Sequence, residues 1–144
     1  MRRKTLFLCV SFLVFGSLYA DNIHTTIELN GVIVNGGLVY VAVYSNENDY
    51  KNETAFAQFI LQPNNTALTY ALDLPEGEYV VSVYQDKNGD KKLNSGLFGI
   101  PSEPVGKTNY NLKGAPGGFN KLKAPVNKSS TRLIVNMGKV RLLG

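Results

Sequence analysis

The chain has 144 residues, with 15 Lys and Arg, 11 Asp and Glu, one His and one Cys. Three basic residues and Cys9 lie in an N-terminal segment that we expect to be removed, so residues 21–144 keep 12 basic residues against 11 acidic ones. A net charge of +1 argues against nucleic-acid binding, which needs a clustered basic surface, and we expect no nucleic-acid partner. The loss of Cys9 excludes disulfides and cysteine-bound metals from the mature protein.

The first 20 residues have the three parts of a secretory signal peptide. A basic start at residues 2–4 precedes the apolar run 6–15, and a cleavage region ends at Ala20. The apolar run is shorter than the roughly 20 residues that a membrane span needs, so we expect cleavage and not an integral membrane protein. Export of a cysteine-free chain suits the bacterial periplasm or the cell exterior. The remaining residues, 21–144, have the length of a single domain.

Four segments of the N-terminal half are assigned from their apolar patterns. Residues 23–29 alternate weakly and predict a first strand. Residues 38–44 are almost entirely Val, Tyr and Leu, which predicts a central strand buried on both faces. Residues 46–55 are polar and Asn-rich, so we expect a loop or one short helical turn. The apolar run 56–61 predicts a further strand.

The next two segments predict a β-hairpin. Residues 66–74 alternate between Leu or Tyr and small or polar residues, which indicates one buried and one solvated face. Residues 78–85 alternate in the same way. Pro75-Glu76-Gly77 between them is a tight turn, and two strands joined by such a turn are typical of a hairpin.

A long loop without regular periodicity, residues 86–109, follows these strands. It is dense in Asp, Asn and Gly. Connections longer than about 12–15 residues are usually functional or disordered in compact domains, and the apolar residues Phe98 and Ile100 argue against disorder. We expect both side chains to bury against the end of the domain, so that the loop folds back as a lid. We therefore place the working surface of the protein at this loop.

The rest of the chain is less regular. Residues 111–127 are rich in Gly and Pro, with Phe119 and Leu122 as the expected core anchors. Residues 131–137 predict a late strand and residues 140–143 a last one. About seven short strands with turn signals and almost no helix predict an all-β fold, a two-layer antiparallel β-sandwich with a long ordered loop.

Two sequence patterns resemble known families. Leu-x-Leu-Pro-x-Gly-x-Tyr-x-Val-x-Val at residues 72–83 is similar to a hairpin of transthyretin-like, or prealbumin-like, β-sandwiches. The residues that follow resemble a bacterial exported family catalogued as domain of unknown function 2141, and this resemblance spans about residues 23–143. The positions that carry it are Asp86, Asn88, Leu93, Asn94, Phe98, Gly99, Ile100, Pro101, Glu103, Gly106, Asn109, Phe119 and Ala124. The resemblance implies an exported transthyretin-like sandwich and no particular activity.

The start of the loop also matches the first part of an EF-hand-type calcium loop. Ligand positions 1, 3, 5 and 9 of that motif fall on the side chains of Asp86, Asn88, Asp90 and Asn94. Position 7, which binds calcium through its backbone carbonyl, falls on Lys92. The motif's Gly at position 6 and Glu at position 12 are absent, and Glu103 is the candidate replacement for that carboxylate. Two interpretations stay open: a calcium site, or a structural loop whose Asp and Asn side chains bind its own backbone.

The loop is also a candidate site for an organic ligand. A groove beneath the lid would offer the apolar side chains of Phe98 and Ile100, with Glu103 and Asn109 as its polar contacts. The alternative is that the folded-back loop is a purely structural plug.

Enzymatic chemistry has little support in the sequence. The only histidine, His24, lies at the start of the domain, which excludes Ser-His-Asp and histidine–metal sites at the loop. The carboxylates of Asp86 and Glu103 are the basis of the alternative, a small hydrolase-like enzyme. We expect instead an exported binding or structural module of the cell envelope, with calcium as its one candidate cofactor. Its partner would be a small ligand or an envelope protein.

Overall fold

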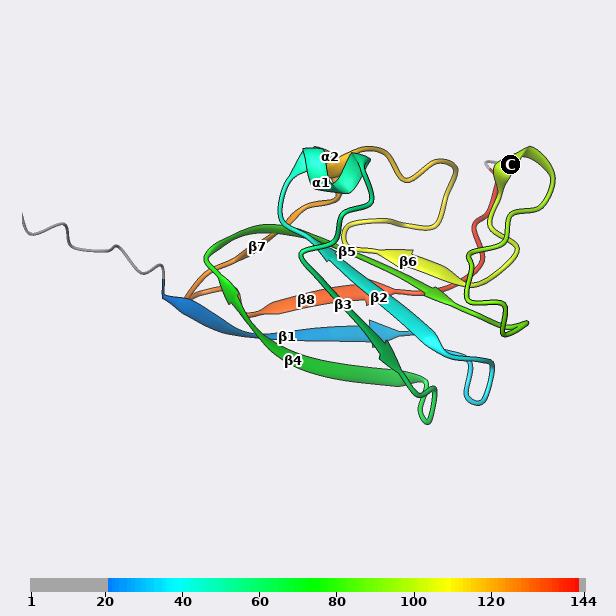
Figure 1. The fold of residues 1–144 in the computed structure, drawn as a ribbon, viewed down its shortest axis with the longest axis horizontal. Coiled ribbons are helices and arrows are strands. Elements are labelled where there is room, and N and C mark those ends of the chain that lie inside the picture. Colours follow the sequence, from blue (N-terminus) through cyan, green and yellow to red (C-terminus); the bar gives the residue numbers. More distant parts are fainter. Residues whose placement is uncertain (1–20, 143–144) are drawn as a thin grey trace, which may run out of the picture.

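The computed structural model describes residues 21–142, which form two β-sheets packed face to face (Figure 1). The predicted signal peptide, residues 1–20, lies outside the described residues. The described part contains eight strands and three short helical turns, which confirms the prediction of an all-β sandwich. None of its helices has the length and apolarity needed to cross a membrane.

The first sheet has three strands in the order β4-β1-β8. Their bounds are Ala67–Pro75 for β4, Asn22–Asn30 for β1 and Arg132–Asn136 for β8. Strand β1 pairs antiparallel with β4 along its whole length but parallel with β8, so the predicted antiparallel arrangement is wrong for this one pair. The chain reaches β8 by way of the other sheet, and a crossover of this kind permits parallel pairing where a short hairpin does not.

The second sheet has the order β3-β2-β5-β6, with β7 also paired to β5. The bounds are Ala57–Leu61 for β3, Val39–Tyr44 for β2, Gly77–Gln85 for β5, Val105–Lys107 for β6 and Ala124–Val126 for β7. All four pairings are antiparallel. Strands β2 and β3 confirm the two strands predicted from the apolar runs.

The main core fills the space between the two sheets. Every second side chain of a strand points to the same face, so the alternating patterns place one apolar row of each strand in this layer. The fully buried members are Ile27, Leu29, Val39, Val43, Leu74, Val81, Val126, Leu133 and Val135.

The predicted hairpin between β4 and β5 is wrong, because the two strands belong to different sheets. The Pro75–Gly77 turn carries the chain across the core. The buried Tyr79 fastens this corner, since its hydroxyl donates to the carbonyl of Pro75 at 2.7 Å. Both strands have apolar rows that face the core from opposite sides, and β1 already pairs with every residue of β4.

The short helices lie outside the sandwich core. Helix α1 (Glu47–Lys51) is the expected single turn, and the side chain of its N-cap, Asn46, accepts from the backbone N–H of Asp49. Helix α2 (Phe119–Leu122) buries both predicted anchors, Phe119 and Leu122. The strand predicted at 140–143 is absent as far as residue 142, where only an isolated bridge joins Arg141 to Lys113.

A second apolar cluster covers one end of the outer face of the second sheet. Tyr44 and Val80 supply its base, and Phe119 and Leu122 pack over them with Tyr110. In Figure 1, α1 and α2 lie above this end, while the loop after β5 leaves on the right.

Candidate functional site

The loop after β5 is closed at its start by Asp86. This residue is only 2% exposed, and its two carboxylate oxygens accept from the backbone N–H groups of Gly89 and Lys91, both at 2.8 Å. Such side-chain bonds satisfy backbone groups that the loop does not pair in a sheet. The carboxylate is therefore directed at its own loop.

Glu103 closes the same loop from its other end. It is 4% exposed, and its carboxylate accepts from the N–H of Lys87 at 2.9 Å and from that of Asn94 at 3.1 Å. The two carboxylates thus engage four different backbone N–H groups. The structural interpretation of the loop expected such bonds from Asp86 but not from Glu103.

The remaining residues of the calcium motif gather at the surface. The side-chain amide of Asn94 donates to Asp90 at 2.8 Å, and that of Asn88 lies within hydrogen-bond distance of both. The Asn94 amide and the Lys92 N–H lower the pKa of the Asp90 carboxyl below its usual range. No group of three or more Asp, Glu, His or Cys side chains that could hold a metal occurs among residues 21–142. Calcium binding at this loop stays a prediction.

The expected burial of Phe98 is wrong. Phe98 is 92% exposed and Leu97 is 84% exposed, because both sit at the tip of the short turn η1 (Leu97–Gly99), away from the sheets. Ile100 is partly buried beside them. The loop therefore projects from the end of the sandwich and is not packed down as a lid.

A hollow of about 320 Å³ lies between this loop and the outer face of the second sheet. Phe98 and Ile100 line it together with Val105, Tyr110 and Pro116. The other two predicted ligand contacts are elsewhere. Glu103 binds the loop backbone, and the side-chain amide of Asn109 donates to the carbonyl of Lys123 at 2.7 Å.

A larger hollow of about 1060 Å³ adjoins the first along the outer face. The two share Ser82, Tyr84, Leu93 and Lys107, so these side chains stand between them. We refer to both hollows together as the Lys107 groove. The smaller hollow has the volume of a site for a small organic molecule, and the larger one slightly exceeds that range.

Aromatic side chains form much of the wall of the larger hollow. Tyr40 and Tyr84 stack across strands β2 and β5, with ring centroids 4.9 Å apart. Tyr44 and Tyr50 meet edge to face at 5.3 Å. Burial raises the pKa of Tyr44, Tyr50 and Tyr84 above the ordinary value of 10.0, so these hydroxyls stay neutral near pH 7.

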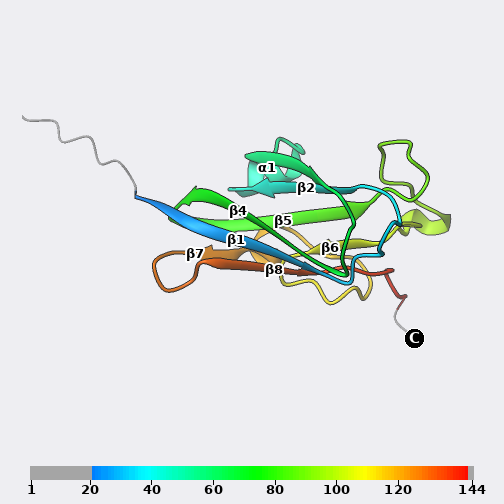
Figure 2. The same ribbon diagram turned by 90° about the horizontal axis from the view of Figure 1, so that it is seen from below.

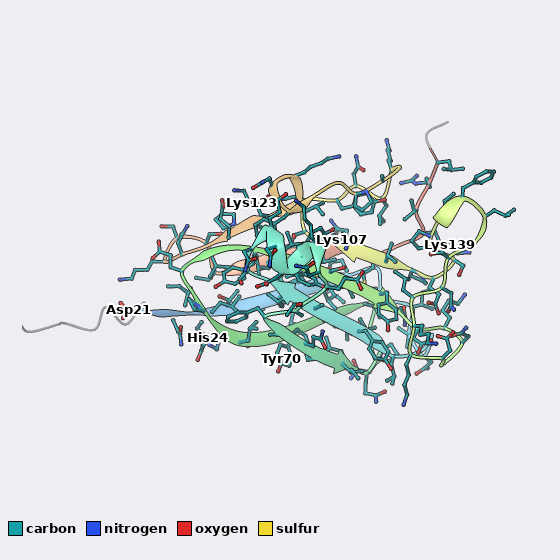
Figure 3. The ribbon with its side chains drawn as sticks, turned by 45° about the horizontal axis from the view of Figure 1, so that its top comes forward. Asp21, His24, Tyr70, Lys107, Lys123 and Lys139 are labelled. Atoms are coloured by element: carbon teal, nitrogen blue, oxygen red, sulfur yellow. The ribbon has the colours of Figure 1, made fainter. Side chains whose placement is uncertain are left out.

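Lys107 is the cation shared by the two hollows (Figure 3), and Lys51 and Glu53 also line the larger one. Its Nζ atom donates to Ser82 Oγ at 2.6 Å and lies 5.1 Å from the centre of the Tyr50 ring. Burial lowers the pKa of Lys107 from 10.5 to about 8, and the negative charge of Glu53 opposes the shift. Among the described residues, no carboxylate forms an ion pair with it.

No local sequence pattern marks Lys107 as a site residue. It belongs to a C-terminal third with many basic residues, and nothing local marks it as buried. Its depth follows from the pairing of β6 with β5, which places Lys107 directly opposite Ser82. The one available signal is Ser82 itself, a polar residue inside the apolar run of β5.

Comparison with known proteins identifies one family. A family model described as "Uncharacterized protein conserved in bacteria (DUF2141)" matches residues 27–134, three quarters of the chain. Neither the curated proteins nor the solved structures include a match.

Proposed function

Because the chain belongs to the bacterial family DUF2141, whose description names no activity, we propose its function from the site: it is an exported binding protein of the bacterial envelope. Its ligand is a small organic anion with an apolar or aromatic body, bound in the Lys107 groove. Export and envelope location rest on the signal peptide predicted at residues 1–20.

A single observation carries this proposal: the partly buried Lys107 ammonium has Ser82 and an aromatic ring as its close partners, and Glu53, which lines the larger hollow, forms no ion pair with it. Placing a charged group in such surroundings costs free energy unless a counter-charge is supplied. A carboxylate or sulfonate of a ligand would supply it through a charge-assisted hydrogen bond.

The walls of the groove select the rest of the ligand. The Tyr40–Tyr84 pair and Leu93 offer flat and apolar surface beside the ammonium. Aromatic side chains of this kind favour ring-containing or aliphatic bodies. A purely inorganic anion would leave this surface unused.

The loop favours binding over catalysis. The carboxylates of Asp86 and Glu103 accept backbone hydrogen bonds, so neither is presented to the groove as an acid or base. Their role in this proposal is to hold Phe98 and Ile100 at the edge of the smaller hollow. The finer fold assignment, a transthyretin-like sandwich, also stays a proposal, supported by the sequence pattern at residues 72–83.

The proposal is tested with two probes of similar shape, 2-naphthoate and the neutral 2-naphthylmethanol. The chain has no Trp, so naphthyl fluorescence is observed without an indole background. We expect naphthoate to bind more tightly than the alcohol. In Lys107→Met we expect naphthoate affinity to fall about tenfold or more, since a charge-assisted hydrogen bond is removed.

Lys128→Met is the matched control, because Lys128 is exposed on the connection between β7 and β8. Its naphthoate affinity should equal that of the wild type. Equal affinity for the acid and the alcohol, or unchanged naphthoate affinity in Lys107→Met, would remove the proposal. Turnover of naphthyl esters lost in Asp86→Asn would instead support the hydrolase alternative.

A further inference from the structure

The tip of the loop forms a second surface, which adjoins the Lys107 groove and shares Leu93, Phe98 and Leu142 with it. It presents four exposed apolar side chains: Leu93 at 44%, Leu97 at 84%, Phe98 at 92% and Leu142 at 65% exposure. Leu93, Phe98 and Leu142 border one hollow, and Figures 1 and 2 both show the loop after β5 and the red C-terminal part of the described chain at the same end of the molecule. We call these four residues the apolar tip.

The backbone holds the tip in a defined shape. Gly96 N–H donates to the carbonyl of Ile100 at 2.7 Å, and Ser102 N–H donates to that of Asn94 at 2.9 Å, so a narrow neck closes below η1. Phe98 has φ +62°, a left-handed conformation that is uncommon for a bulky residue and costs free energy. A strained backbone that exposes a phenylalanine is expected where the exposed ring has a use.

The segments that form this end carry a net positive charge. The segments at this end, residues 86–104, 111–116 and 138–142, contain six basic and three acidic residues, a net charge of +3. The rest of residues 21–142 has six basic and eight acidic residues, a net charge of −2. The basic residues at this end are Lys87, Lys91, Lys92, Lys113, Lys139 and Arg141, all exposed (Lys139 is labelled in Figure 3).

These cations are available to an external partner. None of the six forms an ion pair with another residue of the described chain. Two of the three acids, Asp86 and Glu103, are buried against the loop backbone, which leaves Asp90 as the exposed one. This end of the molecule therefore combines exposed apolar side chains with a net positive charge.

We infer that this end docks on a lipid membrane surface rich in anionic headgroups. Leu97 and Phe98 insert at the boundary between headgroups and acyl chains, and the six cations lie against the headgroups. Apolar insertion together with basic residues is how peripheral proteins bind anionic bilayers. The inference adds an interaction surface to the proposed ligand site and does not depend on it.

The test is sedimentation of the purified protein, expressed from the full-length chain, with vesicles of phosphatidylcholine with and without phosphatidylglycerol. We expect binding to the phosphatidylglycerol vesicles that weakens at least tenfold when salt rises from about 0.1 to about 0.5 M. The variant Leu97→Ser/Phe98→Ser should bind at least tenfold more weakly at low salt. Any contribution of residues 1–20 is the same in both proteins.

Ile134→Ser is the matched control, since Ile134 is a 47% exposed apolar residue on β8. It should bind vesicles like the wild type. Leu97 does not line the Lys107 groove, so the single variant Leu97→Ser should keep its naphthoate affinity while losing vesicle binding. Absence of vesicle binding by the wild type, or equal binding by the wild type and the double variant, would overturn the inference.

Discussion

Asp86 and Glu103 bind the backbone of one short stretch from its two ends. Asp86 accepts from Gly89 and Lys91, and Glu103 accepts from Lys87 and Asn94. Each carboxylate is almost fully buried, so its removal exposes two backbone donors that have no other partner in the sheets. The stability of this loop should therefore respond to changes at either residue.

Asp86→Ala should lower the free energy of unfolding by about 2–4 kcal/mol, because two hydrogen bonds to a buried carboxylate are lost. Asp86→Asn keeps one acceptor oxygen and should lose less. The exposed Asp90→Ala is the control and should change stability little. Urea unfolding gives the free energy of unfolding of all three variants.

The same proteins test the calcium interpretation. If the loop binds calcium, the wild type should melt at a higher temperature in millimolar-range calcium than in chelator, as in weak extracellular sites, and Asp86→Ala should show no such shift. The hydrogen bonds of Asp86 lead us to expect equal melting of the wild type in both conditions. A calcium-dependent rise in the wild type that Asp86→Ala abolishes would contradict this expectation.

Gln85 should be a major stabilising residue. Its side chain is fully buried, and its amide pairs with both backbone groups of Ile33 and with the carbonyl of Gly37. Gln85→Leu would leave these groups unsatisfied, and we expect a loss of about 3 kcal/mol in urea unfolding. The exposed Gln62→Leu should have a small effect, and similar losses in the two variants would show that the buried amide is dispensable.

Gly37 should not tolerate a side chain. Its φ is +99°, and a Cβ atom there would lie 1.7 Å from the carbonyl oxygen of Asp86. Gly37→Ala should therefore cost about 3 kcal/mol or more, because backbone must move apart at the start of the loop. Gly118→Ala is the matched control, since nothing lies within 4 Å of its added Cβ. If Gly37→Ala melted at the same temperature as the wild type, the close approach of Gly37 to the Asp86 carbonyl would be contradicted.

The pH dependence of stability should report the burial of Lys107. Its folded pKa of about 8 is below the ordinary 10.5, so between these values the unfolded chain binds more protons than the folded one. Stability should therefore rise with pH across this window. Below about pH 8 the lysine is charged in both states, and the full cost of burying it is present.

The comparison with Lys107→Met isolates this effect. The free energy of unfolding of the wild type, relative to the variant, should increase by on the order of 2 kcal/mol from about pH 7.5 to about pH 10.5, a value reduced for partial solvation. The free energy of unfolding of Lys128→Met, a change at an exposed site, should depend on pH in the same way as that of the wild type. A constant difference between the wild type and Lys107→Met would show that Lys107 is solvated.

The sandwich and most of its strands follow from local alternation, which Ile27, Val81 and Leu133 obey. The β4–β5 hairpin does not follow, because the turn at Pro75–Gly77 has the same residues whether a chain returns within a sheet or crosses to another. The pairing partner of each strand is set by the assembled core. The local sequence of a strand does not determine which other strand it pairs with.

The residues of the candidate site could be predicted only in part, because the folded chain brings some of them together from distant positions in the sequence. The loop was located from its composition, and Asp86 and Glu103 were identified as its key polar residues. Phe98 was expected to be buried because it is apolar, yet η1 holds it 92% exposed. The ammonium of Lys107 becomes partly buried through contacts with Ser82 and Tyr50, which lie 25 and more residues away in the chain.

The titration of the Lys107 side chain, followed by NMR of its Cε group, tests the central proposal most directly. In the free protein we expect a pKa of about 8, well below the ordinary value of 10.5. Saturating 2-naphthoate should raise it by about one unit or more, because the bound carboxylate favours the charged ammonium. A Lys107 pKa near 10.5 in the free protein, or one that naphthoate leaves unchanged, would contradict an anion site at this lysine.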